Sequence, residues 1–412
     1  MANLIRLAIC LILPLLVLTG CWDQTELEDH AYVVAIGADL AQDNPNEKVF
    51  TAQIVIPAKL AGGGTPGGGG GGGEKSYFQI SVRASSLYCA LNNMQATLSR
   101  DISLLQCRAI FISEELARQS IQPVIEIVVR QPELRRSVFI GVVAGNVADF
   151  FKENQPMLHD NISKYYEEVA TSNKYTGYTT LSTFQSIIEG VETLGENAVA
   201  TLAAINTGSP QEKAPPNVEA GEIARTGSSK AEFIGVAAFR GVKMVGKLGK
   251  REAELLNMLR GDWGSAPYEI SDPLNQRYRL GINLRQVRQP QITADLSSEP
   301  IRLMVKLNLV GTLVSQYTLG DYTQGANRTK MEEQLKDDIE SRARQLVERA
   351  QTEFKSDIFR FGNLAVKPKF LTWDAWKAYN WAEKFPEAEI SIDAQVSVNW
   401  YGMQNQPVLP TP

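Results

Sequence analysis

Histidine is nearly absent from this sequence, which contains only His30 and His159 among its 412 residues. A nucleophile–histidine arrangement would have to use one of these two residues as its base. His159 lies in the polar stretch NQPMLHDN, which favours a surface loop, and His30 lies close to an apolar N-terminal segment, a poor position for a catalytic base. HExxH, GxSxG and paired CxxC motifs are also missing, and no spaced pair of carboxylates stands out. We therefore expect no enzyme, no bound metal and no cofactor.

The sequence also has no excess of basic residues over acidic ones. Lysine and arginine number 41 against 46 aspartates and glutamates, which gives a formal net charge of −5 at pH 7. Nucleic-acid-binding proteins usually carry a basic surface, so we expect no nucleic-acid partner. Any membrane attachment must likewise come from something other than surface charge. A hydrophobic content of 44% is typical of a folded globular protein, and the length allows two or three domains.

The apolar run at residues 7–18 is too short to span a bilayer. Twelve helical residues rise about 18 Å, whereas the hydrocarbon core of a membrane is about 30 Å thick. Arg6 precedes the run as a minimal positive segment, and Pro14 is its only interruption. Residues 1–20 are therefore predicted to be a cleaved signal peptide.

Leu18, Thr19, Gly20 and Cys21 end this segment and resemble a bacterial lipobox. The small residues would let the signal peptidase reach the bond, and the cysteine thiol is the nucleophile that accepts diacylglycerol. Two acyl chains give a stable anchor, because each buried methylene contributes about 0.8 kcal/mol. We predict a mature chain that starts at an acylated Cys21, outside the cytoplasmic membrane. An ordinary secretory signal with a chance cysteine is the alternative.

Two further cysteines, Cys89 and Cys107, remain after Cys10 leaves with the signal peptide and Cys21 is acylated. One disulfide and two buried free thiols both fit their spacing. The sequence leaves this choice open.

The first half of the chain alternates between predicted strands and helices. Ser113 is a plausible N-cap, with Glu114 and Glu115 in the first helical turn. Helical spacing occurs at residues 85–100 and 121–136, and the predicted strands lie at 31–39, 48–60, 76–84, 107–113 and 137–145. The glycine tract at residues 62–73 is predicted to be a flexible connection between two strands, since no helix follows it as a phosphate loop would require.

The second half follows a polar segment rich in proline and glycine, residues 206–229, which is the best boundary in the chain. Gly241, Gly246 and Lys247 have P-loop spacing, but Leu248 stands where the motif needs Ser or Thr, so a turn between two strands is predicted. Residues 301–311 and 389–400 alternate as half-buried strands. Between them, residues 329–357 form an amphipathic helix whose predicted apolar stripe comprises Met331, Leu335, Ile339, Ala343, Leu346, Ala350 and Phe354.

These patterns predict an α+β (mixed α/β) fold of several domains, with mostly antiparallel or mixed sheets covered by helices, after a cleaved lipoprotein signal peptide. The expected divisions are a signal peptide at 1–20, an N-terminal α/β domain at 21–205, a linker at 206–229 and a C-terminal α+β domain at 230–405. The C-terminal domain is expected to be either a single unit or two units, which would then comprise residues 230–268 and 269–405.

An aromatic cluster lies near the C-terminus and comprises Trp373, Trp376, Tyr379, Trp381 and Phe385. Such a stripe is more often core than site, but Trp and Tyr are also enriched in interfaces. Trp373, Trp376 and Trp381 are therefore candidates for a partner surface.

The stretch GCWDQTELEDHAYVVAIGAD resembles the mature N-terminus of the Ger(x)C family, the C subunits of spore germinant receptors. The matching residues are Cys21, Trp22, Asp23, Glu26, Leu27, Gly37 and Asp39. The stretches AIFISEELA, GVAAFRGVKMVGKL and SDIFRFGN followed by two tryptophans extend the resemblance over nearly the whole mature chain. Two departures are the absence of a histidine near Gln106 or Cys107 and the glycine tract at 62–73.

The resemblance implies a three-domain, mixed α/β lipoprotein on the outer face of the spore inner membrane. It implies membrane A and B subunits as partners, a response to nutrients such as amino acids or sugars, and no established catalytic residues. The function expected on this basis is a non-enzymatic, lipid-anchored receptor subunit.

Two other functions compete with this expectation. The first is a lipid-anchored solute-binding protein that captures a nutrient itself; such proteins usually have two parallel βαβ lobes, whereas the second half here is predicted to be antiparallel strands and a helix. The second is a tethered envelope hydrolase, for which no nucleophile–base arrangement is found.

Overall fold

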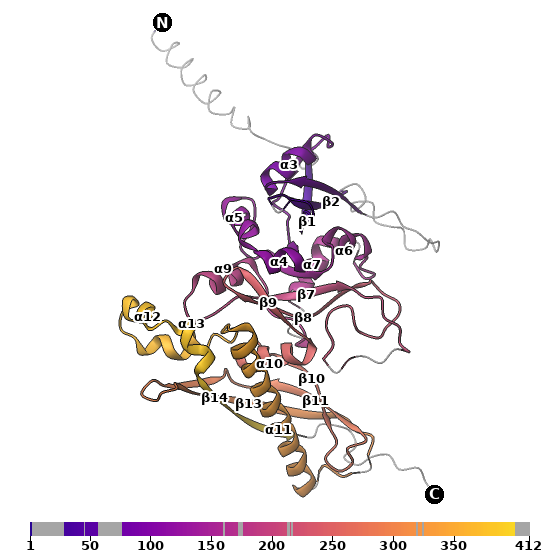
Figure 1. Ribbon diagram of the computed structural model, residues 1–412. Helices are drawn as coiled ribbons and strands as arrows, with labels where there is room; N and C mark the ends of the chain where they lie inside the picture. The colour runs from indigo at the N-terminus through magenta and orange to yellow at the C-terminus, as the bar shows by residue number, and fades with distance from the viewer. Residues whose placement is uncertain are drawn as a thin grey trace, which may run out of the picture.

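The computed structural model describes Met1 and residues 29–399, except 45, 57–75, 160, 172–175, 212–214, 216, 319 and 324. The predicted signal peptide, Cys21 and the glycine tract at 62–73 lie outside the described residues. Two sheets stacked along one long axis make up the described chain (Figure 1).

The first sheet has nine strands in the order β3-β2-β1-β5-β6-β7-β8-β9, with β4 paired to β1. β1, β5, β6 and β7 are parallel, whereas β2, β3, β8 and β9 are antiparallel to their neighbours, so the sheet is mixed. The strands are β1 (His30–Leu40), β2 (Lys48–Val55), β3 (Tyr77–Ala84), β4 (Asp101–Ser103), β5 (Ala109–Ser113), β6 (Phe139–Ala144), β7 (Val199–Ile205), β8 (Ala231–Arg240) and β9 (Lys243–Leu248).

Helices cover both faces of the first sheet, which explains the nearly continuous burial of its central strands β1, β5, β6 and β7. One face packs against α3 (Leu87–Gln95), α4 (Glu114–Gln119), α5 (Gln122–Arg130) and α9 (Phe184–Glu192). The other face packs against α6 (Val147–Glu153) and α7 (Ile162–Ala170), with Phe111 at the centre of an aromatic cluster. The predicted N-cap is confirmed, because the Ser113 hydroxyl accepts a hydrogen bond from the backbone N–H of Leu116 at 3.4 Å.

Residues 206–229 connect β7 to β8, and these two strands pair with each other in the first sheet. Part of the segment packs back on β8, since Glu232 accepts hydrogen bonds from the side chain of Asn206 at 3.0 Å and from the backbone of Gly221 at 2.6 Å. The domain boundary expected here stays a prediction. The turn predicted in place of a P-loop is confirmed: it lies between β8 and β9, and the next helix begins only at Lys250.

The second sheet is centred on β13 (Arg302–Ser315), which pairs antiparallel with β11 (Arg279–Gln286) and β12 (Gln291–Asp295). β10 (Ser265–Ser271) extends it beyond β11. β14 (Glu389–Asn399) runs parallel to β13 over eleven paired positions, so this sheet is also mixed. The α+β fold class with mixed sheets is therefore confirmed.

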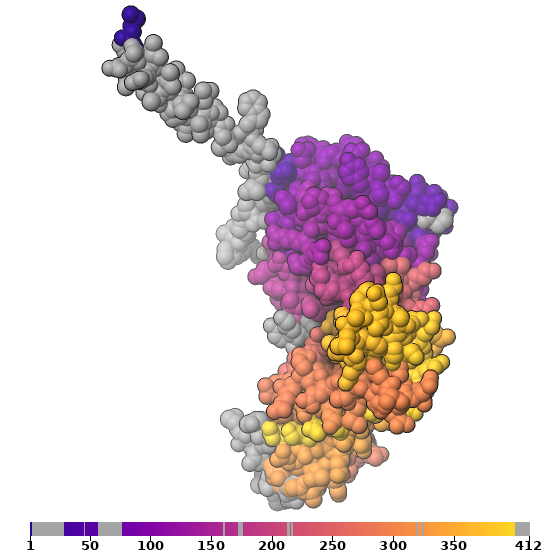
Figure 2. Space-filling model, turned by 90° about the vertical axis from the view of Figure 1, so that its left-hand side faces the viewer, coloured from indigo at the N-terminus to yellow at the C-terminus, as the bar shows by residue number. Residues whose placement is uncertain are grey.

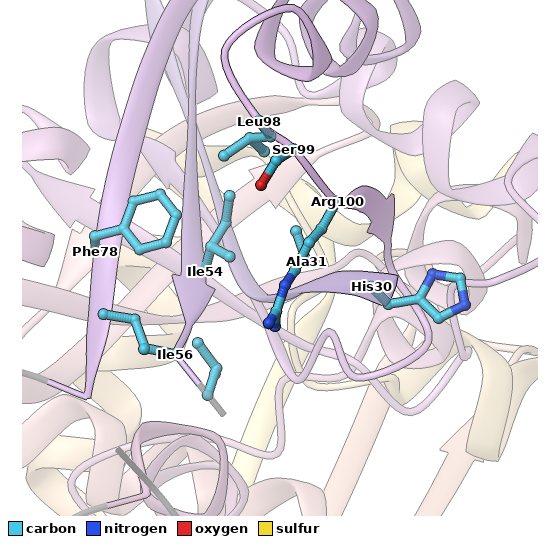
Figure 3. Close-up of a pocket in the computed structure, with 9 residues that line it drawn as sticks. His30, Ala31, Ile54, Ile56, Phe78, Leu98, Ser99 and Arg100 are labelled. Atoms are coloured by element: carbon cyan, nitrogen blue, oxygen red, sulfur yellow. The ribbon is translucent and has the colours of Figure 1, made fainter. Parts of the chain in front are cut away.

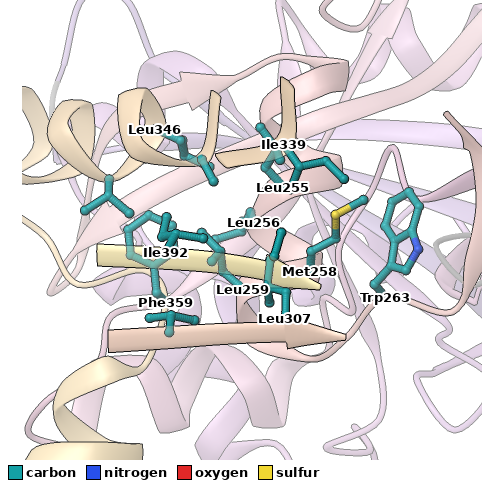
Figure 4. Packing of buried hydrophobic residues seen from close by; sticks show 14 of the residues in the cluster. Leu255, Leu256, Met258, Leu259, Trp263, Leu307, Ile339, Leu346, Phe359 and Ile392 are labelled. Carbon is teal, nitrogen blue, oxygen red and sulfur yellow. The ribbon is translucent and has the colours of Figure 1, made fainter. Parts of the chain in front are cut away.

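Two helices lie on the second sheet and enclose its core. α10 (Lys250–Arg260) packs against α11 (Gly325–Arg349) and contacts strands of both sheets. α11 lies directly along β14 and continues as a π-helical turn, η2 (Ala350–Phe354). All seven residues of the predicted stripe from Met331 to Phe354 are buried. Figure 4 shows Leu255 and Leu259 of α10 between α11 and the strands that carry Leu307 and Ile392.

A C-terminal segment connects η2 to β14 through short helical pieces. These are η3 (Gly362–Val366), η4 (Lys367–Lys369), α12 (Trp373–Tyr379), α13 (Trp381–Lys384) and η5 (Phe385–Glu387). Figure 2 shows this segment, in yellow, between the magenta body of the first sheet and the orange body of the second.

Candidate functional site

The two histidines lie apart from each other. His159 Nε2 is 2.8 Å from Glu168 Oε2 of α7, in the polar loop predicted from the sequence. His30 begins β1 and lines a cavity of about 230 Å³ together with Arg100 and the apolar side chains of Ile54, Phe78 and Leu98. Figure 3 shows its imidazole pointing away from these apolar side chains.

The described part of the chain offers no metal cluster, because no three His, Cys, Asp or Glu side chains gather there to hold an ion. Nor does any helix within it combine the length and apolar character needed to cross a membrane. Cys89 and Cys107 are both free thiols; Cys89 is exposed and Cys107 is buried.

The three candidate tryptophans have different environments. Trp376 and Trp381 are 2% and 3% exposed, so they belong to the core of this chain, whereas Trp373 is 55% exposed on α12. Trp381 is held because its indole N–H donates to a buried carboxylate, and Trp376 stacks near Tyr379 with ring centroids 6.2 Å apart. Of the three, only Trp373 has an exposed side chain.

Asp357 is the buried carboxylate at the centre of the C-terminal segment. Its oxygens accept four N–H groups: the indole of Trp381 at 2.8 Å and the backbones of Gly362, Phe361 and Phe359 at 2.8, 3.2 and 3.1 Å. Burial raises the pKa of Asp357 to about 6, and the four donors oppose that rise. The carboxylate thus organises the loop that leads from α11 into η3.

The same loop joins the C-terminal segment to the first sheet. The backbone carbonyl of Asp357 accepts from the N–H of Asn197 at 2.9 Å, and the N–H of Asn363 donates to the carbonyl of Gly195 at 2.9 Å. A Cβ on Gly195 would lie 2.7 Å from the Trp376 ring and 2.8 Å from the backbone nitrogen of Asn363. Glycine is therefore required here by close approach as well as by its φ of +91°. We call this set of contacts the sheet junction.

Two residues of the N-terminal motif have structural roles in the first sheet. Asp39 Oδ1 accepts a 2.9 Å hydrogen bond from the backbone N–H of Val147, the first residue of α6. Gly37 leaves room for the same helix, because a Cβ there would lie 2.6 Å from a methyl group of Val147. The motif therefore docks α6 on β1.

The sequence did not single out Asp357 or Gly195 as important positions. SDIFRFGN was noticed only as a resemblance, and Gly195 lies in no motif. The alternation of Asp357 and Arg360 with Ile358, Phe359 and Phe361 gives no local signal that singles out a buried, hydrogen-bonded carboxylate.

The fold and these contacts define a multi-domain α+β protein whose two mixed sheets are joined by a hydrogen-bonded junction. Residues 23–205 match the family described as "Spore germination protein N-terminal domain", and residues 234–402 match "Spore germination B3/ GerAC like, C-terminal". The chain belongs to the Ger(x)C family, and this membership places it in spore germination.

Relatives and one solved structure accompany these family matches. Spore germination protein KC of Bacillus subtilis (strain 168) is 24% identical over 98% of this chain and 97% of its own length. YfkR of the same organism is 33% identical, but over 34% of this chain and 36% of that protein. The crystal structure of the GerBC protein aligns with a TM-score of 0.49 and 16% identity, over 91% of this chain and 99% of that one.

Proposed function

We propose that this protein is a non-enzymatic, lipid-anchored C subunit of a spore germinant receptor, held on the outer face of the spore inner membrane by an acylated Cys21. The observation that carries the proposal is the position of the lipobox. Leu18–Cys21 ends a segment of signal-peptide length, and the match to the N-terminal family domain begins at residue 23, two residues later. Nothing that belongs to the matched domain would be lost by cleavage before Cys21.

The partners in this proposal are the membrane A and B subunits of the receptor. The surface that we assign to them is the tip of the C-terminal segment, where Leu364, Leu371 and Trp373 are 50%, 103% and 55% exposed. Contiguous exposed apolar patches are typical of protein interfaces, and Trp is among the residues enriched in their energetic centres. Trp376 and Trp381 would support this tip from inside rather than touch the partner.

The anchoring part is tested by cell fractionation. Cys21→Ala should move the protein from the membrane fraction to the soluble fraction and impair nutrient-triggered germination. Cys89→Ala is the matched control, since it removes an exposed thiol on α3 and should change neither property. An unchanged membrane fraction for Cys21→Ala would contradict the anchor.

The contact part is tested by co-purification of the A and B subunits with the full chain. Trp373→Ala should reduce recovery of at least one of them, whereas Tyr88→Ala, which truncates a 79% exposed aromatic side chain on α3, should not. Equal recovery of the A and B subunits with both variants would contradict the assignment of this surface to a partner. It would not affect the proposal that Cys21 carries a lipid anchor.

A further inference from the structure

β3 is an edge strand, and no strand of the described chain pairs with its outer side. It ends the order of the first sheet and pairs with β2 along its whole length without a register shift. An edge strand exposes a row of N–H and C=O groups that can pair with a strand of another molecule. The outer side of β3 is therefore a candidate interface.

One hydrogen bond beside β3 determines which of its residues have outward-facing backbone groups. The backbone N–H of Ile56 donates to the carbonyl of Ser76 at 2.8 Å, and these two residues continue the β2–β3 register by one position. Hydrogen-bonded and non-hydrogen-bonded pairs alternate in an antiparallel ladder. The even-numbered residues of β3 therefore bond to β2, and the odd-numbered residues direct their N–H and C=O groups away from the sheet.

Gln79, Ser81 and Arg83 are the outward-facing residues on which the argument depends. Their backbone N–H and C=O groups form no hydrogen bond with any residue that the structure describes. β3 contains no proline, and its one charged side chain, Arg83, is held back by Asp43 at 2.8 Å and Glu47 at 2.5 Å. Nothing in the described chain thus prevents a strand from pairing here.

Other edge strands of this protein are protected against such pairing. On β14, the outward N–H groups of Ala394 and Val398 donate to the carboxylates of Glu340 and Glu332 on α11, at 2.9 and 2.7 Å. β10 contains Pro267, which has no N–H to offer, and β9 packs against α4. The open edge of β3 is an exception to this pattern.

The side chains of β3 allow two copies to pair antiparallel about Ile80. Phe78, Ile80 and Val82 share one face, where Phe78 is 37% exposed. Phe78 then lies opposite Val82 of the second copy, an aromatic–β-branched pair of the kind that stabilises sheets. On the other face, Gln79 lies opposite Ser81 of the second copy, so their outward N–H and C=O groups exchange two hydrogen bonds. This register matches both the apolar faces and the open backbone groups.

We propose that this protein forms a twofold-symmetric dimer in which the β3 strands of two copies pair antiparallel and join their first sheets into one. A twofold contact uses the same patch on both copies, and β3 supplies both sides of the required pattern. Arg83 lies opposite Tyr77 of the second copy, so no like charges face each other. The proposal goes beyond the receptor-subunit function and does not depend on the lipid anchor.

Cysteine cross-linking of the full chain, purified in detergent, tests this register. Ile80→Cys should give a disulfide-linked dimer on mild oxidation, because a non-hydrogen-bonded pair places its Cα atoms about 4.5 Å apart, within the range of disulfides. Val82→Cys is the matched control on the same face. It should not cross-link, because the two substituted positions would be offset by about 14 Å along the strands.

Both cysteine variants carry Cys89→Ser, because Cys89 is an exposed thiol. The parent Cys89→Ser chain measures any background from the remaining cysteines. Equal cross-linking of Ile80→Cys and Val82→Cys, or no cross-linking of Ile80→Cys above the parent, would overturn the proposal.

Sedimentation equilibrium of the full chain in detergent tests the dimer itself. The wild type should show a reversible monomer–dimer equilibrium. Ser81→Pro should weaken dimerisation by about tenfold or more, because each copy loses an outward N–H that its own sheet does not use. Thermal melts show whether this variant stays folded. Unchanged dimerisation of folded Ser81→Pro would overturn the proposal, and a wild type that stays monomeric at every concentration would overturn it in favour of a strand from another protein.

Discussion

The indole N–H of Trp381 donates a 2.8 Å hydrogen bond to Oδ2 of Asp357, and both side chains are at most 3% exposed. Twenty-four residues separate them in the chain, so this bond closes the C-terminal segment on itself. Because the backbone of Asp357 also bonds to Asn197, the pair links the segment to the first sheet. The junction therefore depends on one buried carboxylate with a complete set of donors.

Trp381→Phe should destabilise the protein by about 1–3 kcal/mol, because it removes one donor from a buried carboxylate while keeping most of the aromatic volume. Trp373→Phe, at the exposed position, should change stability by less than about 0.5 kcal/mol. Urea unfolding of both variants measures the difference. Equal free energies of unfolding for the two variants would show that the indole hydrogen bond makes no net contribution to stability.

Gly195→Ala should be more destabilising than Gly227→Ala. Both glycines have positive φ, +91° and +79°, so both substitutions strain the backbone. Only Gly195 is crowded, since nothing lies within 4 Å of a Cβ built on Gly227. The difference between their unfolding free energies isolates the close approach at the sheet junction, and we expect about 1–3 kcal/mol. Equal losses in the two variants would contradict the tight contact between Gly195 and Trp376.

Asp39 should make stability depend on pH in the acid range. Burial raises the pKa of its carboxyl from 3.8 to about 6, and Asp149 and Glu115 add to the rise. The folded state then binds a proton more tightly than the unfolded state, so the contribution of this group to stability falls as pH rises from about 4 to about 6.

Asp39→Asn removes this titration and keeps an oxygen acceptor for the Val147 N–H. The stability of the wild type relative to this variant should therefore decrease by on the order of 3 kcal/mol between pH 4 and pH 7. Thermal or urea unfolding of both proteins across this range measures the trend. Parallel pH profiles would contradict the shifted pKa.

Thiol labelling should distinguish Cys89 from Cys107 in the mature, acylated protein. Cys89 is exposed and should react at once, whereas burial raises the pKa of Cys107 to about 12 and shields its sulfur. One equivalent of reagent should react with the native protein and two after denaturation, with or without a reducing agent. A second thiol that appears only after reduction would indicate a disulfide instead.

Local sequence patterns predicted the elements of this fold well. The stripe from Met331 to Phe354 is buried as its spacing indicates, because a single apolar face on a helix can only be satisfied by a core. The Ser113 cap and the turn in place of a P-loop were also predictable, because each depends on residues within a few positions of one another.

Pairings over long distances were not predictable from periodicity. Alternation in residues 389–399 predicts a half-buried strand, but not that it runs parallel to β13. The contact between Gly195 and Asn363 joins segments 168 residues apart, and no local pattern encodes it. The aromatic stripe was ambiguous because burial depends on this same contact, which covers Trp376 and leaves Trp373 exposed.

Mass spectrometry of the N-terminal peptide of the mature protein, isolated from spore membranes, tests the central proposal most directly. A lipid-anchored receptor subunit requires a peptide that starts at Cys21 and carries a diacylglycerol group on its sulfur. An N-terminal peptide that retains residues 1–20, or one that starts at Cys21 with a free thiol, would contradict it.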